Sequence, residues 1–386
     1  MSEARVKVSI EDFMFIRKKS KAGLDVLLTT YPEQGSKNVG DNLITDSAIK
    51  LVRYRVPDYD PFLLFREEPL ERFDAEELRT ILAPGFSVND ESYPKLFRLY
   101  EDPEKIPKEF YPVGCTFQHL VPLKETYEQY KYSKKTLAFL SSVVKGSGAI
   151  PCRDQLIVDM LERNSIPAFY CGDLALYDDN TVGKPFIPPA VIGSVAFTVQ
   201  HKPKFINQSF LLLDLIKAEF PKAKLYVVHH SQINKNSQRV ADYAKSIGFV
   251  ERDLCGDVSN LDFYNQIDLH VGYRLHGHLS FLRSRKPSFL LVEDTRSFGV
   301  ANTGDLEIGC FSAHDGTGEL VDDDAPNKLF EYVRTQKANG FIDYFKLFGF
   351  IDSTYHVSVR PFFDLFSKKL GWRESIYSRL LRLVRV

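Results

Sequence analysis

The segment YRLHGHLSF brings together an arginine and two histidines whose side chains could do chemistry. Arg274 carries a planar, permanently charged guanidinium that suits phosphate or carboxylate groups. His276 can give or take a proton near neutral pH. The pair predicts a site that binds an anion and moves a proton, with Leu275 and Gly277 beside it and His278 as a structural residue. The alternative is an arginine in a surface ion pair and a histidine that caps its own helix.

The surrounding sequence places this segment where a strand ends and a helix begins. The run QIDLHVGY predicts a buried strand, and HGHLSFLRSR has the apolar spacing of a helix that starts near His276. Backbone N–H groups at a helix N-terminus favour an anion, so this position strengthens the prediction of an anion site around Arg274.

A second turn, SKNVGDNLITD, follows the first predicted strand, Gly23–Tyr31. Gly40 would let a ligand approach the backbone closely, and Asn38 shares the same turn. Asp41 is either the N-cap of the next helix or a carboxylate that orients or deprotonates a hydroxyl group. The turn matches neither the dinucleotide-binding glycine fingerprint nor a Walker loop, so it gives little support to dinucleotide or ATP binding.

A third segment, PCRDQL, has the same strand-to-helix character. Asp154 is expected to cap the helix that follows. Arg153 is expected to project over a crevice, where it and Arg274 would converge on a small dianion.

Other histidines and acids near strand ends have two interpretations. His119, in CTFQHL, is either a catalytic base or a buried, hydrogen-bonded histidine. His229 and His230 end another strand, and either one of them lines a pocket or both belong to a plain loop. The acidic run VDDDAPNKL resembles a metal site, but proline after an acidic run is typical of a helix start, so no metal is expected.

Apolar strands alternate with helical segments along most of the chain. This alternation predicts an α/β fold in which parallel sheets are covered by helices on both faces. Prolines and glycines between Asp179 and Ser194 predict a linker, after which the alternation starts again. We therefore expect two Rossmann-like domains, 1–183 and 190–345, facing a crevice, and a C-terminal helical segment, 346–386. Ligands bind at the carboxyl ends of such strands, so the crevice is the expected site.

Composition argues against several classes of protein. The 386 residues are 44% hydrophobic and 26% charged with a net charge of -1, which fits a globular protein and gives no support to a nucleic-acid binder. The five cysteines show neither zinc-ligand spacing nor a disulfide framework, which favours reduced thiols in the cytoplasm. The N-terminus lacks the apolar core of a signal peptide, and no apolar stretch is long enough to span a membrane.

The far C-terminus has a different character. Residues 368–386 place basic side chains on one face of a predicted helix and apolar side chains on the other. Such a helix can lie on an anionic lipid surface, which predicts peripheral contact with the inner face of the membrane. The alternative is that the apolar face packs on the protein itself.

Three segments, SKNVGDNLI, CRDQLIVDML and YRLHGHLSFLRSRKPSFLLVEDTR, resemble the polysaccharide pyruvyl transferase family in order and rough spacing. The resemblance spans about Leu24 to Asn302. It implies a glycosyltransferase-B-like (GT-B-like) fold that transfers pyruvate from phosphoenolpyruvate to a pair of sugar hydroxyls as a ketal, with no metal and no cofactor. The segment APGFS departs from the family's glycine-rich run. VEDTR stands where a D-x-K-like pattern is usual, with Arg296 in the place of the lysine.

The resemblance implies roles for the candidate residues. The first domain would bind the acceptor and the second the donor. Arg153, Arg274 and the helix N-termini would neutralise phosphoenolpyruvate, His276 would be the acid, and His119 or Asp41 the base. The other residues expected to contact substrate are Asn38, Gly40, Leu275, Gly277, His230 and Arg296.

The implied acceptor is a sugar of a surface polysaccharide, such as a capsule or exopolysaccharide, or its lipid-linked precursor. One alternative is a glycosyltransferase of the same fold that uses a nucleotide sugar. Another is a catalytically inactive protein that binds glycans or serves as a scaffold.

Overall fold

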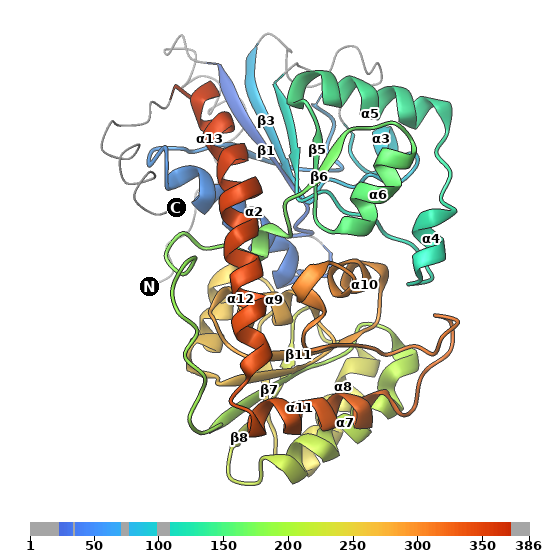
Figure 1. The fold of residues 1–386 in the computed structure, drawn as a ribbon, viewed down its shortest axis with the longest axis vertical. Coiled ribbons are helices and arrows are strands. Elements are labelled where there is room, and N and C mark those ends of the chain that lie inside the picture. The colour runs from blue at the N-terminus through green and yellow to red at the C-terminus, as the bar shows by residue number, and fades with distance from the viewer. Residues whose placement is uncertain (1–22, 34, 71–76, 99–108, 372–386) are drawn as a thin grey trace.

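The computed structural model describes residues 23–371, apart from residue 34 and the segments 71–76 and 99–108. In this part of the chain, a four-stranded and a six-stranded parallel sheet lie one above the other along the long axis of the molecule, with a two-stranded parallel sheet beside the first and helices between and around them (Figure 1). The four-stranded and two-stranded sheets are formed by strands β1 to β6, in the first half of the chain. The six-stranded sheet is formed by β7 to β12, in the second half.

The first half is built on a four-stranded parallel sheet in the order β2-β1-β3-β4. A parallel pair, β5-β6, continues from β4 through a bridge between Cys115 and Cys152. The strands are β1 (Leu24–Thr29), β2 (Phe62–Phe65), β3 (Leu78–Pro84), β4 (Phe110–Val113), β5 (Ile150–Cys152) and β6 (Ala168–Tyr170). β1 reads LDVLLT and is mostly apolar because a parallel strand is covered on both faces, and its buried Asp25 pairs with Arg79.

Helices cover both sides of the first sheet, with α2 on one side and α5 on the other (Figure 1). The helical elements of this half are α2 (Val39–Arg53), α3 (Ser92–Lys95), α4 (Lys124–Glu128), α5 (Lys134–Ser147), α6 (Gln155–Arg163) and the 3-10 helix η4 (Leu174–Leu176).

The second half has a six-stranded parallel sheet in the order β12-β11-β10-β7-β8-β9. The strands are β7 (Ser194–Thr198), β8 (Lys224–His229), β9 (Val250–Asp253), β10 (Leu269–Gly272), β11 (Ser288–Val292) and β12 (Cys310–Ser312). The strand order turns back between β7 and β10, which creates a topological switch point where open α/β sheets bind ligands.

Helices α9 and α10 lie between the second sheet and the first half, whereas α7, α8 and α11 lie on its far side (Figure 1). The helical elements are η5 (Pro203–Phe205), α7 (Ile206–Glu219), α8 (Lys235–Ser246), η6 (Val258–Gln266), α9 (Leu275–Arg283), α10 (Thr295–Ala301), η7 (Gly304–Glu307) and α11 (Ala325–Ala338). α11 has a proline in its first turn, as the run VDDDAPNKL predicted.

The C-terminal helices run from the second half back to the first as one long path, α12 (Ile342–Thr354), the π-helical turn η8 (Tyr355–Val359) and α13 (Arg360–Lys369) (Figure 1). Asp364 on α13 accepts a 2.6 Å hydrogen bond from the buried Arg55 Nε. The Phe366 ring packs on Tyr59 and Tyr111, with ring centroids 6.3 and 5.2 Å apart. α13 therefore packs against the first half. Most of the predicted basic tail, 368–386, lies outside the described residues.

The fold is α/β, with two Rossmann-like domains facing each other as the alternation of strands and helices predicted, in the GT-B-like arrangement that the family resemblance implied. No helix of the described residues is long and apolar enough to cross a membrane. The sequence did not reveal the short strands β2, β9 and β12, all of which lie toward the outside of their sheets. Strands of three or four residues carry too few side chains to show a period.

Candidate active site

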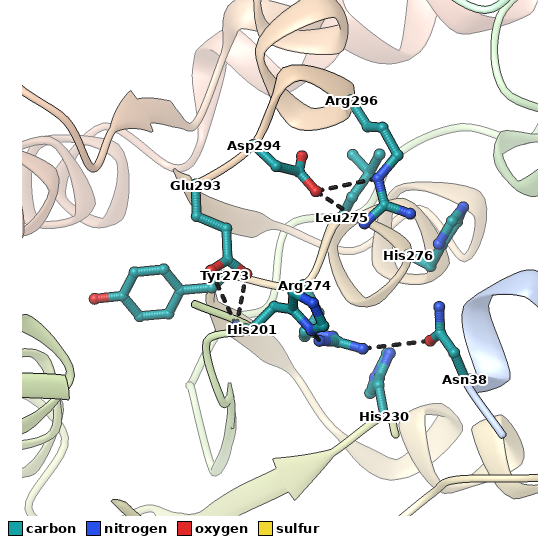
Figure 2. Close-up of a pocket in the computed structure, with 10 residues that line it drawn as sticks. All are labelled: Asn38, His201, His230, Tyr273, Arg274, Leu275, His276, Glu293, Asp294 and Arg296. Carbon is teal, nitrogen blue, oxygen red and sulfur yellow. Dashed lines mark hydrogen bonds and ion pairs between the residues drawn. The ribbon is translucent and has the colours of Figure 1, made fainter. Parts of the chain in front are cut away.

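A small pocket of about 20 Å³ lies at the carboxyl ends of β7, β8, β10 and β11, facing the N-terminus of α2 in the other half (Figure 2). Its position coincides with the switch point of the second sheet. The pocket is lined by Asn38, His201, His230, Tyr273, Arg274, Leu275, His276, Glu293, Asp294 and Arg296.

Arg274 is the N-cap residue of α9, and its guanidinium crosses the pocket toward the first half (Figure 2). Its Nη2 donates to Ser231 Oγ at 2.5 Å and lies 3.4 Å from Asn38 Oδ1, and its Nη1 lies 3.3 Å from His201 Nδ1. Burial lowers the pKa of Arg274, although it stays protonated. Within the described part of the chain Arg274 forms no ion pair with a carboxylate, although the charges of Glu293, Asp41 and Asp294 act on it.

Arg296 is held by the cap of α10. Asp294 accepts from the backbone N–H of Ser297 at 2.8 Å and from Arg296 Nη2 at 2.8 Å. Burial opposes ionisation of Asp294, but Arg296 and these hydrogen bonds hold its pKa below the usual range. Glu293 accepts from the backbone N–H of His201 at 2.8 Å, and burial raises its pKa to about 7. The pocket therefore has one paired and one unpaired arginine.

His276 is the second residue of α9 and is 5% exposed. Its Nε2 lies 3.4 Å from Asp173 Oδ2, which belongs to the first half and follows β6. On the Nδ1 side the ring lies against Gly40, where a Cβ atom would overlap it. Burial opposes ionisation of Asp173, but the hydrogen bond and charge of His276 and the charge of Arg153 lower its pKa. The imidazole is thus enclosed between the two halves.

The structure corrects the expectation for Arg153. This residue is 2% exposed and does not line the pocket. Its Nη1 lies 3.4 Å from Asp173 Oδ2, and its Nη2 donates to Thr116 Oγ1. Arg153 therefore lies behind His276, because it pairs with Asp173, an acidic residue that the sequence analysis did not select. Asp154 caps α6 as predicted, with its Oδ1 accepting from the backbone N–H of Ile157 at 3.0 Å.

The structure also corrects the expectation for Asp41. The N-cap of α2 is Asn38, whose Oδ1 accepts from the backbone N–H of Gly40 at 3.2 Å. Asp41 is the third residue of the helix and accepts from Asn38 Nδ2 at 2.9 Å. It does not line the pocket, whereas Asn38 does. Asn38 serves as the cap because its side chain can both accept from the helix and donate to the acid one turn on.

His119 is exposed, so the interpretation of a buried histidine is wrong. Its backbone N–H donates to Thr295 Oγ1 at 2.9 Å, and its ring stacks beside Phe117 with centroids 6.3 Å apart. It lies outside the residues that line the pocket. The contact with Thr295 joins a loop of the first half to the start of α10.

His230 is 2% exposed and lines the pocket, whereas its neighbour His229 pairs with Glu251 at 3.0 Å. His230 Nε2 lies 2.5 Å from the hydroxyl of Tyr264, and its Nδ1 has no hydrogen-bond partner. Burial lowers the pKa of His230 well below its usual value, so the ring is neutral. The pocket therefore contains a buried imidazole nitrogen without a partner.

The remaining candidates lie in the first turns of α9. Leu275 lines the pocket. Gly277 does not line it, but a Cβ atom there would come within 3.3 Å of His230 and 3.2 Å of His270. His278 is fully buried, and its Nδ1 lies 2.8 Å from Ser288 Oγ, so it is structural as expected.

Sequence reasoning missed several residues of this site. The pocket also contains His201, Tyr273, Glu293 and Asp294, and Asp173 lies directly behind it. All of them follow a strand end, which is the signal that selected Arg274. None of them was chosen, because carboxylates, histidines and tyrosines in loops have many structural roles. Within the described residues no group of three or more histidines, cysteines or acids could hold a metal ion.

Solved structures show distant likeness. A putative UDP-N-acetylglucosamine 2-epimerase from Listeria monocytogenes aligns at 10% identity and a TM-score of 0.47, over 83% of this chain and 91% of that one. UDP-GlcNAc 2-epimerase from Neisseria meningitidis aligns at 12% and 0.46, over 91% and 100%. Accessory secretory protein 1, 2 and 3 of Streptococcus pneumoniae aligns at 10% and 0.43, over 75% of this chain and about half of that chain, 53%.

A search of curated proteins gives no match. Residues 38–295 match the sequence profile of the family described as polysaccharide pyruvyl transferase, which is more than half of the chain. The match begins at Asn38 and extends to Thr295, so it includes nearly all of the pocket. The chain belongs to the polysaccharide pyruvyl transferase family.

Proposed function

We propose that this protein transfers pyruvate from phosphoenolpyruvate to a sugar of a surface polysaccharide or its lipid-linked precursor, forming a pyruvyl ketal. The observation that carries the proposal is the unpaired guanidinium of Arg274 in the pocket at the N-terminus of α9. A partly buried positive charge without a carboxylate partner is costly unless a ligand supplies the anion. Phosphoenolpyruvate carries both a carboxylate and a phosphate.

His230 supports the same ligand. Within the described residues, the buried hydroxyl of Tyr264 has one hydrogen-bond partner, His230 Nε2. Burial raises the pKa of Tyr264, so the hydroxyl keeps its proton and donates it to Nε2. The neutral imidazole then carries its own proton on Nδ1, the atom without a partner. A buried N–H donor without an acceptor, close to Arg274, fits an oxygen of an anionic ligand.

The proposed reaction has two steps. A sugar hydroxyl oxygen bonds to C2 of phosphoenolpyruvate while C3 takes a proton and becomes a methyl group. A second hydroxyl then bonds to C2 as the C2–O bond to phosphate breaks. Each hydroxyl gives up its proton to a base, and inorganic phosphate leaves with the ketal complete. His276 is proposed as the acid that protonates C3, because it is a buried imidazole that lines the pocket two residues after Arg274, at the start of α9. The bases predicted from the sequence, His119 and Asp41, remain predictions, since neither lines the pocket.

Phosphate release from phosphoenolpyruvate tests the proposal, with simple or lipid-linked galactosides as acceptors and mass spectrometry of the product. We expect release that depends on acceptor and that Arg274→Ala and His276→Ala each reduce at least ~100-fold. If the protein neither releases phosphate nor gains thermal stability from phosphoenolpyruvate, the proposal fails. A rise in melting temperature with a nucleotide sugar instead would favour a glycosyltransferase that uses such a donor.

A further inference from the structure

We propose that Asp173 is the positioning residue of His276, holding Nε2 of the imidazole so that the Nδ1 edge is presented to the pocket. This inference rests on the proposed role of His276 and adds a residue that neither the sequence motifs nor the pocket lining contains. Asp173 is 2% exposed, and its Oδ2 lies 3.4 Å from His276 Nε2.

The carboxylate is itself fixed from two sides. Its Oδ1 accepts from the backbone N–H of Ala175 at 2.9 Å and caps η4. Its Oδ2 faces Arg153 Nη1, also at 3.4 Å, and Arg153 in turn donates to Thr116 Oγ1. The positive charge of Arg153 keeps Asp173 ionised although it is buried. The carboxylate therefore cannot turn away from the imidazole without losing its cap or its ion pair.

The other edge of the imidazole has room because residue 40 is glycine. A Cβ atom there would overlap Nδ1 and the ring carbon beside it. The bare backbone of α2 thus lets the Nδ1 edge lie against the first half, in the pocket that Asn38 and Arg274 also line. His276 Nε2 makes no hydrogen bond of good geometry within the described residues, and Asp173 Oδ2 is the acceptor that we propose for its proton. With the proton of the neutral ring held on Nε2 in this way, Nδ1 is the nitrogen that can exchange a proton with substrate.

The pair is assembled from two domains. Asp173 follows β6 in the first half, and His276 opens α9 in the second. Neither half alone contains both the imidazole and the group that orients it, so the orientation of His276 depends on the docking of the two halves. Family motifs read along the chain contain only the His276 side of this pair.

Asp173→Asn is the test, because asparagine keeps the size and can still accept from Ala175. We expect kcat to fall roughly 10- to 100-fold while KM for phosphoenolpyruvate changes less than about threefold. As pH rises, we also expect the activity of the variant to fall at a lower pH than that of the wild type, because the carboxylate that stabilises the protonated imidazole has been removed. Asp178→Asn is the matched control, since Asp178 pairs with Arg283 at the other end of α9, 3.2 Å away. It should leave the pH profile unchanged.

Nitrogen-15 spectra of the labelled histidines give a readout that does not depend on turnover. His276→Gln identifies the signal of His276. The wild type should show the proton of the neutral ring on Nε2, and Asp173→Asn should mix the two tautomers. An unchanged tautomer together with an unchanged pH profile would overturn the inference and leave Asp173 a structural cap.

If wild type shows no turnover of phosphoenolpyruvate, the proposed function fails, while the spectra still decide whether Asp173 orients His276. If Asp173→Asn does not fold, Asp173→Ser keeps a hydroxyl that can cap η4 and removes the charge. The same shift in tautomer is then expected, and its absence would count against the inference.

Discussion

Gly40 and His276 come from different halves of the chain and are in direct contact, with the imidazole occupying the space where a Cβ atom of residue 40 would lie. Gly40 is the second residue of α2, where alanine would ordinarily favour the helix. The glycine is thus explained by the ring that it admits and not by the backbone that it forms.

Gly40→Ala should therefore reduce activity strongly. The added methyl group must displace the imidazole, and a shift of about 1 Å in a catalytic group can lower the rate roughly 100-fold. Gly349→Ala on α12 is the matched control, because a Cβ atom there has nothing within 4 Å. Steady-state rates and melting temperatures of the two variants separate loss of geometry from loss of folding. Full activity in Gly40→Ala would mean that His276 can move without consequence.

Arg274→Lys should weaken the binding of phosphoenolpyruvate although the positive charge remains. An ammonium group cannot reproduce the planar fork that reaches Asn38 and Ser231 at once. We expect the rise in melting temperature caused by phosphoenolpyruvate to be largely lost. Arg252→Lys, at a charged edge strand, should keep that rise. An intact response in Arg274→Lys would show that the guanidinium does not hold the anion.

Asp154→Asn should change how stability depends on pH. Asp154 is 1% exposed, its Oδ2 has no partner, and burial raises its pKa from 3.8 to about 6. The folded state thus binds more protons than the unfolded state between these values, so wild-type stability falls as pH rises through this window. The shift corresponds to about 3 kcal/mol.

Asparagine retains the cap but cannot ionise, so Asp154→Asn should lose this fall. Its free energy of unfolding relative to the wild type should rise between about pH 4 and pH 7 and then level off. Urea titrations across this pH range measure the difference. Parallel curves for the two proteins would show that Asp154 ionises freely in the folded state.

Phe366→Ala should destabilise the packing of α13 against the first half. Phe366 is fully buried against Tyr59 and Tyr111, and removal of a buried phenylalanine costs roughly 3–5 kcal/mol. Leu365→Ala, at a position that is 48% exposed, should cost far less. Thermal unfolding of the two variants checks this prediction. Equal losses of stability would argue against a stabilising contact between α13 and the first half.

Deletion of residues 372–386 should reduce binding to anionic vesicles if the basic tail contacts lipid. The deletion should start after Gly371, because α13 extends to Lys369, which pairs with Glu109 at 3.0 Å. Each basic residue near such a surface contributes about 1 kcal/mol, so binding should also weaken with salt. Neutral vesicles are the control, and unchanged sedimentation with anionic vesicles would refute the membrane prediction.

The sequence by itself determined the fold class and the family. Apolar strands alternating with helices are a local pattern, because a strand buried on both faces must be apolar throughout. The position of Arg274 and His276 at a strand end was equally local, since the strand and the helix beside them have their own periods. These features need no knowledge of what lies across the crevice.

Only the tertiary structure decided which residues face one another. The sequence predicted that Arg153 binds a ligand. In the structure it is paired with Asp173, which lies in another loop and does not belong to any of the motifs. Asn38 takes the cap expected of Asp41 and reaches Arg274 in the other domain. The role of Gly40 is to leave space for the ring of His276, which lies more than 200 residues away along the chain. Such contacts depend on how two domains dock, and no periodicity within either segment records that.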